Sequence, residues 1–148
     1  MKLPSNIQFP PDVEFFDDLR LLCYRPRGVL NEASVNRAIK VLGELEFSLK
    51  QPFNRFTDTV DAEAIDLNFQ YILHISLYRR LSYSGRPPVK SAILATDATA
   101  IHYARLHALL TQGSPIKVHI FQERRAAAKW LNVPVARLTA PTSREGDA

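Results

Sequence analysis

Cysteine and glycine are scarce in this sequence, which has one cysteine, Cys23, and five glycines among 148 residues. A single cysteine cannot form an internal disulfide or a multi-cysteine zinc site, and such chains are typical of reducing compartments. Five glycines leave little material for a phosphate-binding loop. No P-loop, Gly-x-Gly-x-x-Gly or Gly-x-Ser-x-Gly pattern occurs, so common nucleotide-binding and hydrolase signatures are missing.

Long apolar runs are also missing. No stretch approaches the roughly 20 apolar residues that span a bilayer. Pro4, Pro10 and Pro11 interrupt the apolar segment that a signal peptide needs. We therefore expect no membrane span and a cytoplasmic location.

Basic residues are in modest excess, and they are scattered. Nineteen Lys and Arg residues against 15 Asp and Glu residues give a net charge of +4, and no basic run is longer than two. A protein that binds nucleic acid concentrates positive charge on one face or along one helix. The pattern permits an acidic partner, but we expect no nucleic-acid partner.

The apolar content of 46% and the charged content of 23% are those of a globular domain. The prolines are spaced so that four blocks contain none, namely 27–51, 53–86, 89–114 and 116–133. Because proline occurs mainly between helices and strands, each block is expected to hold one strand–helix unit or its helix. We predict a single domain over residues 1–137, followed by a disordered C-terminal tail over 138–148.

The first elements carry clear local signals. Residues 13–16 and 19–24 are predicted strands that flank a tight turn at Asp17 and Asp18. Asn31 is a good N-cap for the helix that follows, and Leu30 and Val35 occupy the positions of a hydrophobic staple.

The segment 67–78 is ambiguous. Every odd residue from Leu67 to Leu77 is apolar, which is a strand pattern, yet a helical face fits as well. Two arguments favour a helix. Acidic residues precede the segment and Arg79 and Arg80 end it, as the helix dipole prefers, and twelve residues are about twice the length of a usual strand.

The second half of the chain alternates strands and helices. Strands are predicted near 53–57, 89–96 and 116–121, with one face of the last strand exposed to solvent. Asp97 caps a helix that stops at Gly113, and a short helix carries Ala126, Ala127, Trp130 and Leu131 on one side, with Trp130 on the sheet. The order β-β-α-β-α-β-α-β-α predicts an α/β fold with a mainly parallel mixed sheet and covering helices.

The residues that follow this order resemble a STAS domain, and more narrowly its SpoIIAA-like, anti-sigma-factor-antagonist relatives. The resemblance covers about residues 13–133. It is carried by the opening hairpin into Gly28-Val29-Leu30, Arg55-Phe56-Thr57-Asp58, Lys90-Ser91-Ala92-Ile93-Leu94, Val118-His119-Ile120-Phe121 and Trp130-Leu131-Asn132. These patterns define a fold rather than a catalytic site.

The resemblance implies a regulatory module that binds another protein and is switched by phosphorylation of a serine. This sequence departs from that motif. Asp66 matches the aspartate before the serine, but Leu67 replaces the serine and Phe69 replaces the glycine. The phosphorylation switch therefore does not carry over. The related Sec14-like architecture implies lipid or small-ligand binding as the alternative.

A parallel sheet binds ligands at the carboxyl ends of its strands, where helix N-termini also offer N–H groups to an anion. At this rim the sequence predicts Arg25, Arg27, Asp58, Thr59, Thr96, Asp97 and Arg124 as a candidate site for a small anionic ligand or a partner. Ordinary capping and turn roles, which need no ligand, explain Asp58, Asp61 and Asp97, and they are favoured over a ligand site.

Catalytic and metal-binding patterns are not evident. His102 and His107 are five residues apart rather than three or four, and Cys23 lies in an apolar strand, where a buried thiol is expected. We expect no enzyme, cofactor or metal. A protein-interaction module, through another protein or self-association, is the first hypothesis, and a lipid or small-ligand carrier is the second. A large apolar cavity would favour the second, and aromatics of the second helix left exposed would mark a partner surface.

Overall fold

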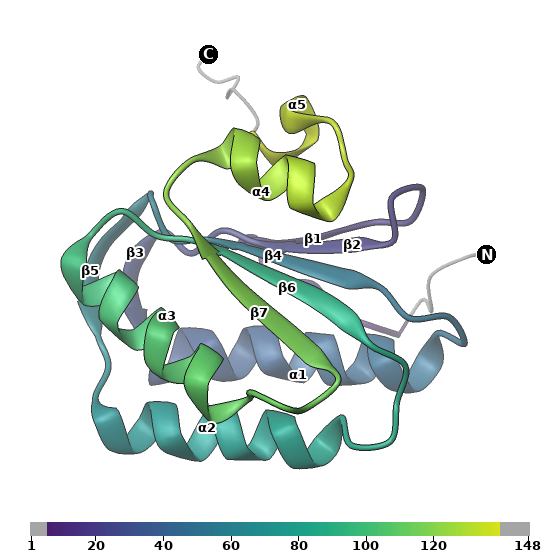
Figure 1. Ribbon diagram of the computed structural model, residues 1–148, viewed down its shortest axis with the longest axis horizontal. Coiled ribbons are helices and arrows are strands. Elements are labelled where there is room, and N and C mark those ends of the chain that lie inside the picture. Colours follow the sequence, from purple (N-terminus) through teal and green to yellow (C-terminus); the bar gives the residue numbers. More distant parts are fainter. Residues whose placement is uncertain (1–5, 140–148) are drawn as a thin grey trace.

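Five strands form one sheet in the computed structural model, which describes residues 6–139 (Figure 1). Their order across the sheet is β1-β2-β4-β6-β7, and only β1 runs antiparallel to its neighbour. The strands are β1 (Val13–Phe16), β2 (Leu21–Tyr24), β4 (Asn54–Asp58), β6 (Val89–Leu94) and β7 (Ile116–Phe121). The mainly parallel mixed sheet and the opening hairpin are confirmed.

Two further strands form a small parallel sheet that the sequence did not predict. These are β3 (Gly28–Asn31) and β5 (Ala62–Asp66). Gly28 has a φ of +66°, a left-handed conformation that glycine adopts without steric cost. The small sheet joins the segment before the first helix to the segment before the second, and it therefore fixes where both helices begin.

Helices cover both faces of the large sheet (Figure 1). Three lie on one face, namely α1 (Glu32–Ser48), α2 (Phe69–Ser82) and α3 (Ala98–Leu110). The other face carries α4 (Arg124–Leu131) and the short α5 (Val135–Leu138), and α5 is an addition to the predicted order.

The predicted N-caps are confirmed. The side chain of Asn31 accepts a hydrogen bond from the backbone N–H of Ser34, and the Ser34 hydroxyl accepts one from the backbone N–H of Asn31. Asp97 accepts hydrogen bonds from Thr99 and Ala100 at the start of α3. Each cap satisfies N–H groups that the first helical turn leaves free, and such caps stabilise a helix by roughly 1 kcal/mol.

Residues 69–82 are helical, so the prediction for 67–78 is confirmed from Phe69 on, but the acidic half of its charge argument was wrong. The acidic residues before the segment lie in strands β4 and β5 and the turn between them, not in the first turn of α2. Asn68 caps the helix instead. The basic half of the argument holds, because Arg79 and Arg80 are in the last turn.

Side chains of the strands point alternately to the two faces of the sheet, so each face has its own core. On the α4 side the buried residues are Leu21, Cys23, Phe56, Ala92, Leu94, Ala127, Ala128, Leu131 and Leu138. Trp130 is half-buried and stacks on His119 of β7 with 4.4 Å between ring centroids, so its predicted packing on the sheet is confirmed. Ala126 is exposed, contrary to the prediction, because α4 turns Ala128 inward.

The folded chain extends past the predicted boundary at residue 137. Leu138 is fully buried in the α4 core, and its carbonyl accepts a hydrogen bond from Arg25 at 2.9 Å. The rest of the predicted tail, from residue 140 on, lies outside the described residues.

Candidate functional site

Two of the predicted rim residues meet at the carboxyl end of β4. Asp58 is buried, and its carboxylate accepts hydrogen bonds from Arg124 at 2.8 Å and from the backbone N–H of Val60 at 3.0 Å. Thr59 donates its hydroxyl to the carbonyl of Leu94 at 2.8 Å, which ties β4 to β6. These bonds join α4 to the sheet and engage the carboxylate of Asp58, whereas the buried Nε of Arg124 has no hydrogen-bond partner among residues 6–139.

The other predicted rim residues lie in different parts of the structure. Arg25 is buried and donates to carbonyls of α5, while Arg27 is exposed on the segment before β3. Thr96 and Asp97 are exposed after β6, where Asp97 is engaged in capping α3. The structure thus divides the predicted set among both faces of the sheet, and only Asp58 and Arg124 contact each other through their side chains.

A larger feature lies on the opposite face, between the sheet and helices α1, α2 and α3. A cavity of about 190 Å³, partly open to solvent, lies there. Most of its lining is aliphatic, with Leu22 and Ile93 from the sheet, Leu42 from α1, Ile72 from α2 and Ala104 from α3. We refer to it as the interior cavity.

One end of the interior cavity is bounded by two arginines. Arg55 of β4 and Arg79 of α2 both line the cavity, and both donate to Oε2 of Glu46 on α1, at 2.7 Å and 2.5 Å. All three side chains are buried, with exposures of 4–6%. Burial lowers the pKa of Arg55 from its ordinary value, and the repulsion from Arg79 acts in the same direction.

Further polar groups of the cavity lie on α3 and β2. His107 shares a hydrogen bond of 2.8 Å with the hydroxyl of Ser76, and burial and then the charge of Arg79 lower the pKa of His107 to about 4. Tyr24 is 8% exposed, and its hydroxyl has no hydrogen-bond partner within residues 6–139. Burial raises the pKa of Tyr24, so the phenol is neutral.

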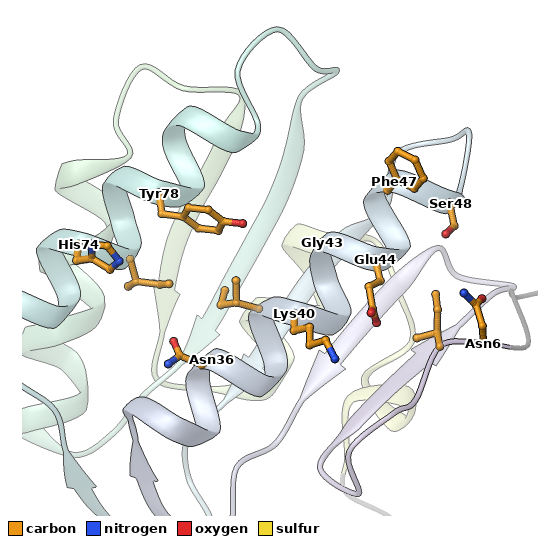
Figure 2. A pocket seen from close by; sticks show the side chains of 12 residues that line it. Asn6, Asn36, Lys40, Gly43, Glu44, Phe47, Ser48, His74 and Tyr78 are labelled. Atoms are coloured by element: carbon orange, nitrogen blue, oxygen red, sulfur yellow. The ribbon is translucent and has the colours of Figure 1, made fainter.

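A second, open depression runs along the outside of the molecule between α1 and α2, with a volume of about 710 Å³. Figure 2 shows Tyr78 of α2 projecting toward α1, across from Lys40, and Phe47 at the far end of α1. We call it the α1–α2 groove. Both aromatic side chains are mostly exposed, Phe47 at 87% and Tyr78 at 51%.

The sequence did not identify Glu46, Arg55 or Arg79 as a group. A signal was present, because the charged Arg55 directly precedes Phe56 in a predicted strand. The pairing itself needs the order of the strands and the side-by-side placement of α1 and α2, which local patterns do not contain.

Comparison with known proteins identifies the architecture. No family model and no curated protein matches the chain. Among solved structures, it is similar to an uncharacterised protein of the DUF3478 family with a SpoIIAA-like fold from Shewanella loihica PV-4. The match has a TM-score of 0.53 and 17% identity, and it covers 80% of this chain and 90% of that chain. The chain has a SpoIIAA-like fold.

Leu67, which the sequence resemblance puts at the place of the antagonists' serine, is turned inward. Leu67 lines the interior cavity, and its carbonyl accepts a hydrogen bond from the Tyr103 hydroxyl at 3.0 Å. The position has neither a hydroxyl nor an outward-facing side chain. The prediction that no phosphorylation switch operates there keeps its physical basis.

Two other expectations concern reactive groups and membranes. Cys23 is fully buried, and desolvation raises the pKa of its thiol to about 12, so it is a protonated core residue. Among residues 6–139, no set of three or more His, Cys, Asp or Glu side chains is placed to bind a metal ion. In the same range, no helix has both the length and the apolar character to cross a bilayer.

Proposed function

We propose that this SpoIIAA-like domain binds a small apolar molecule in its interior cavity and has no catalytic role. The observation that carries the proposal is the cavity itself, about 190 Å³ of space beneath three helices in a domain of ordinary size. Native protein interiors are close-packed and contain few voids larger than a water molecule. A void of this size forfeits packing energy unless something fills it.

The volume sets the size of the ligand. At about 30 Å³ per water molecule, 190 Å³ corresponds to roughly six waters, so a ligand of about six to eight non-hydrogen atoms fits. An engineered apolar cavity of about 150 Å³ in another protein binds benzene. The cavity of this chain is therefore large enough for a short aliphatic molecule.

The test uses 1-hexanol as a neutral probe of matching size. We expect 1-hexanol to raise the melting temperature in proportion to its occupancy and to shift methyl NMR signals of Ile72 and Leu42. Ala104→Leu adds bulk inside the cavity and should abolish these shifts. Ala98→Leu is the matched control, because Ala98 is exposed on the same helix.

Two results would overturn the proposal. One is the absence of any chemical-shift change in the cavity methyl groups at saturating 1-hexanol. The other is equal binding by the wild type and a folded Ala104→Leu variant, because the probe would then lie elsewhere.

A second function, self-association through α2, is favoured by the polarity of that helix. It buries Ser76 and Arg79 while it exposes Leu77 and Leu81, at 42% and 75%. Exposed apolar residues that gather on one helix mark an interaction surface. Two aromatic residues of the same helix, Phe69 and Tyr78, are also mostly exposed, which is what the sequence leads us to expect of a partner surface.

The partner that fits this surface is a second copy of the chain. Exposed Glu63 and Asp66 precede the start of α2, and exposed Arg86 follows its end. When two copies of α2 pack antiparallel about a two-fold axis, the acidic end of each faces the basic end of the other. The apolar stripe and the charges are therefore self-complementary.

A further inference from the structure

The charges at one end of the interior cavity are unbalanced, and this deepens the proposed ligand-binding function, on which the inference rests. The buried cluster contains two guanidinium groups, Arg55 and Arg79, and one carboxylate, Glu46. Its formal sum is one positive charge. Arg86 adds to the excess from outside, since it donates to the backbone carbonyl of Glu46 at 3.2 Å.

The geometry directs this excess toward the cavity. Arg55 and Arg79 line the cavity, whereas Glu46, the only carboxylate of the cluster, does not. The other titratable side chain of α3 at this end, His107, supplies no negative charge in either protonation state. The lining of the cavity therefore includes two arginines and no acidic residue.

A buried charge is costly unless it is paired, and the cost falls when an ion of opposite sign enters the same site. Guanidinium groups bind carboxylates through charge-assisted hydrogen bonds of matching planar geometry. A phosphate monoester carries about −1.5 to −2 charges at neutral pH and would overcompensate a single excess charge. One carboxylate balances it.

We propose that the ligand of the interior cavity is a short aliphatic monocarboxylate, whose carboxylate binds Arg79 and Arg55 while its hydrocarbon chain lies among the aliphatic residues. The aliphatic lining accounts for the chain, and the cluster accounts for the charge. Neutral molecules of the same length should enter the same cavity more weakly.

The experiment compares three probes of equal chain length, hexanoate, 1-hexanol and hexylammonium, by NMR titration of the full chain at neutral pH. We expect hexanoate to bind at least about tenfold more tightly than 1-hexanol, which is the range that a charge-assisted hydrogen bond supplies. Hexylammonium should bind more weakly than 1-hexanol, because it adds a third cation to the site.

The outcomes separate this inference from the proposed function. If 1-hexanol binds as tightly as hexanoate, the carboxylate assignment is wrong and the cavity function stands. If none of the three probes binds, the proposed function itself is wrong, and the assignment fails with it.

Two substitutions should change the selectivity in opposite directions. Arg79→Gln leaves Arg55 neutralised by Glu46, so hexanoate should lose roughly tenfold in affinity while 1-hexanol changes less than about twofold. Glu46→Gln removes the only negative charge of the cluster, so the ratio of hexanoate to 1-hexanol affinity should rise. A structural role for the cluster alone would not produce this rise.

The control variant is Arg105→Gln. Arg105 is exposed on α3 and does not line the cavity, so this change should leave the ratio of hexanoate to 1-hexanol affinity unaltered. Arg79→Lys retains the charge and serves if Arg79→Gln does not fold. An unchanged ratio in folded Arg79→Gln and Glu46→Gln would overturn the inference.

Discussion

The Oγ of Ser76 and the Nδ1 of His107 lie 2.8 Å apart and join α2 to α3 beside the interior cavity. Ser76 is fully buried, and the charge of Arg79 also acts on the ring of His107. Burial, and secondarily Arg79, lower the pKa of His107 to about 4, from 6.5 for an unperturbed histidine. The native protein therefore holds a neutral imidazole at physiological pH.

The first prediction is a loss of stability on acidification. Between pH 6.5 and pH 4 the unfolded chain binds a proton at His107 that the folded chain does not, so the free energy of unfolding falls as the pH falls. The total loss is on the order of 3 kcal/mol at 1.36 kcal/mol per pKa unit. Urea unfolding at a series of pH values measures it.

Two substitutions assign this pH dependence. His107→Gln keeps a hydrogen-bonding side chain without the titration, and it should flatten the profile between pH 4 and 6.5. His102→Gln is the matched control, because His102 is exposed on the same helix, and it should leave the profile unchanged. A His107→Gln profile as steep as that of the wild type would contradict the prediction.

The relation between sequence and structure is uneven. Caps and hairpins were predictable because Asn31, Asp97 and the Asp17 turn act on residues within four positions along the chain. The small β3–β5 sheet was not predictable, because its strands are short and the whole segment α1–β4 separates them along the chain. Acidic residues of β5 therefore looked like the start of a helix.

The candidate site shows the same limit. The carboxyl ends of the strands were predictable from the α/β order, and Asp58 does meet Arg124 there. The lining of the interior cavity depends on the strand order and on how closely the three helices pack. Glu46 and Arg79 are 33 residues apart, and their contact is not encoded in any local pattern.

The second prediction concerns the Asp58–Arg124 pair. Asp58 is 1% exposed, and Arg124→Ala leaves its carboxylate buried with one backbone N–H as its remaining partner within the described chain. Breaking a buried pair costs roughly 3–5 kcal/mol, and the 30% exposure of Arg124 places the loss at the lower end. Asp58→Asn combined with Arg124→Ala should recover part of that loss, because the uncompensated charge is gone. Thermal melts of the single and double variants give the coupling free energy.

The third prediction concerns Trp130, which stacks on His119 and receives the ammonium of Lys90 at 5.3 Å from its ring centroid. A fully buried tryptophan costs roughly 3–5 kcal/mol when truncated to alanine. Because Trp130 is only half-buried, we expect Trp130→Ala to cost roughly 2–3 kcal/mol and to lower the melting temperature by several degrees. His119→Ala removes only the stacking partner and should cost about 1 kcal/mol. A shift of less than about 2 °C for Trp130→Ala would instead indicate that the ring serves an interface.

The fourth prediction tests self-association through α2. Leu81→Glu and Leu77→Glu place a charge in the exposed apolar stripe and change no buried contact, so each variant should keep the wild-type melting temperature at low protein concentration. Sedimentation velocity should show a concentration-dependent dimer for the wild type and a monomer for both variants. Val135→Glu is the matched control, since Val135 is exposed to a similar degree on α5, across the sheet.

Added salt should weaken the dimer, because exposed charge pairs at the ends of α2 are screened over about 10 Å at 0.1 M. A wild type that sediments as a monomer over the whole concentration range, or a dimer that survives Leu81→Glu, would show that α2 is not the interface.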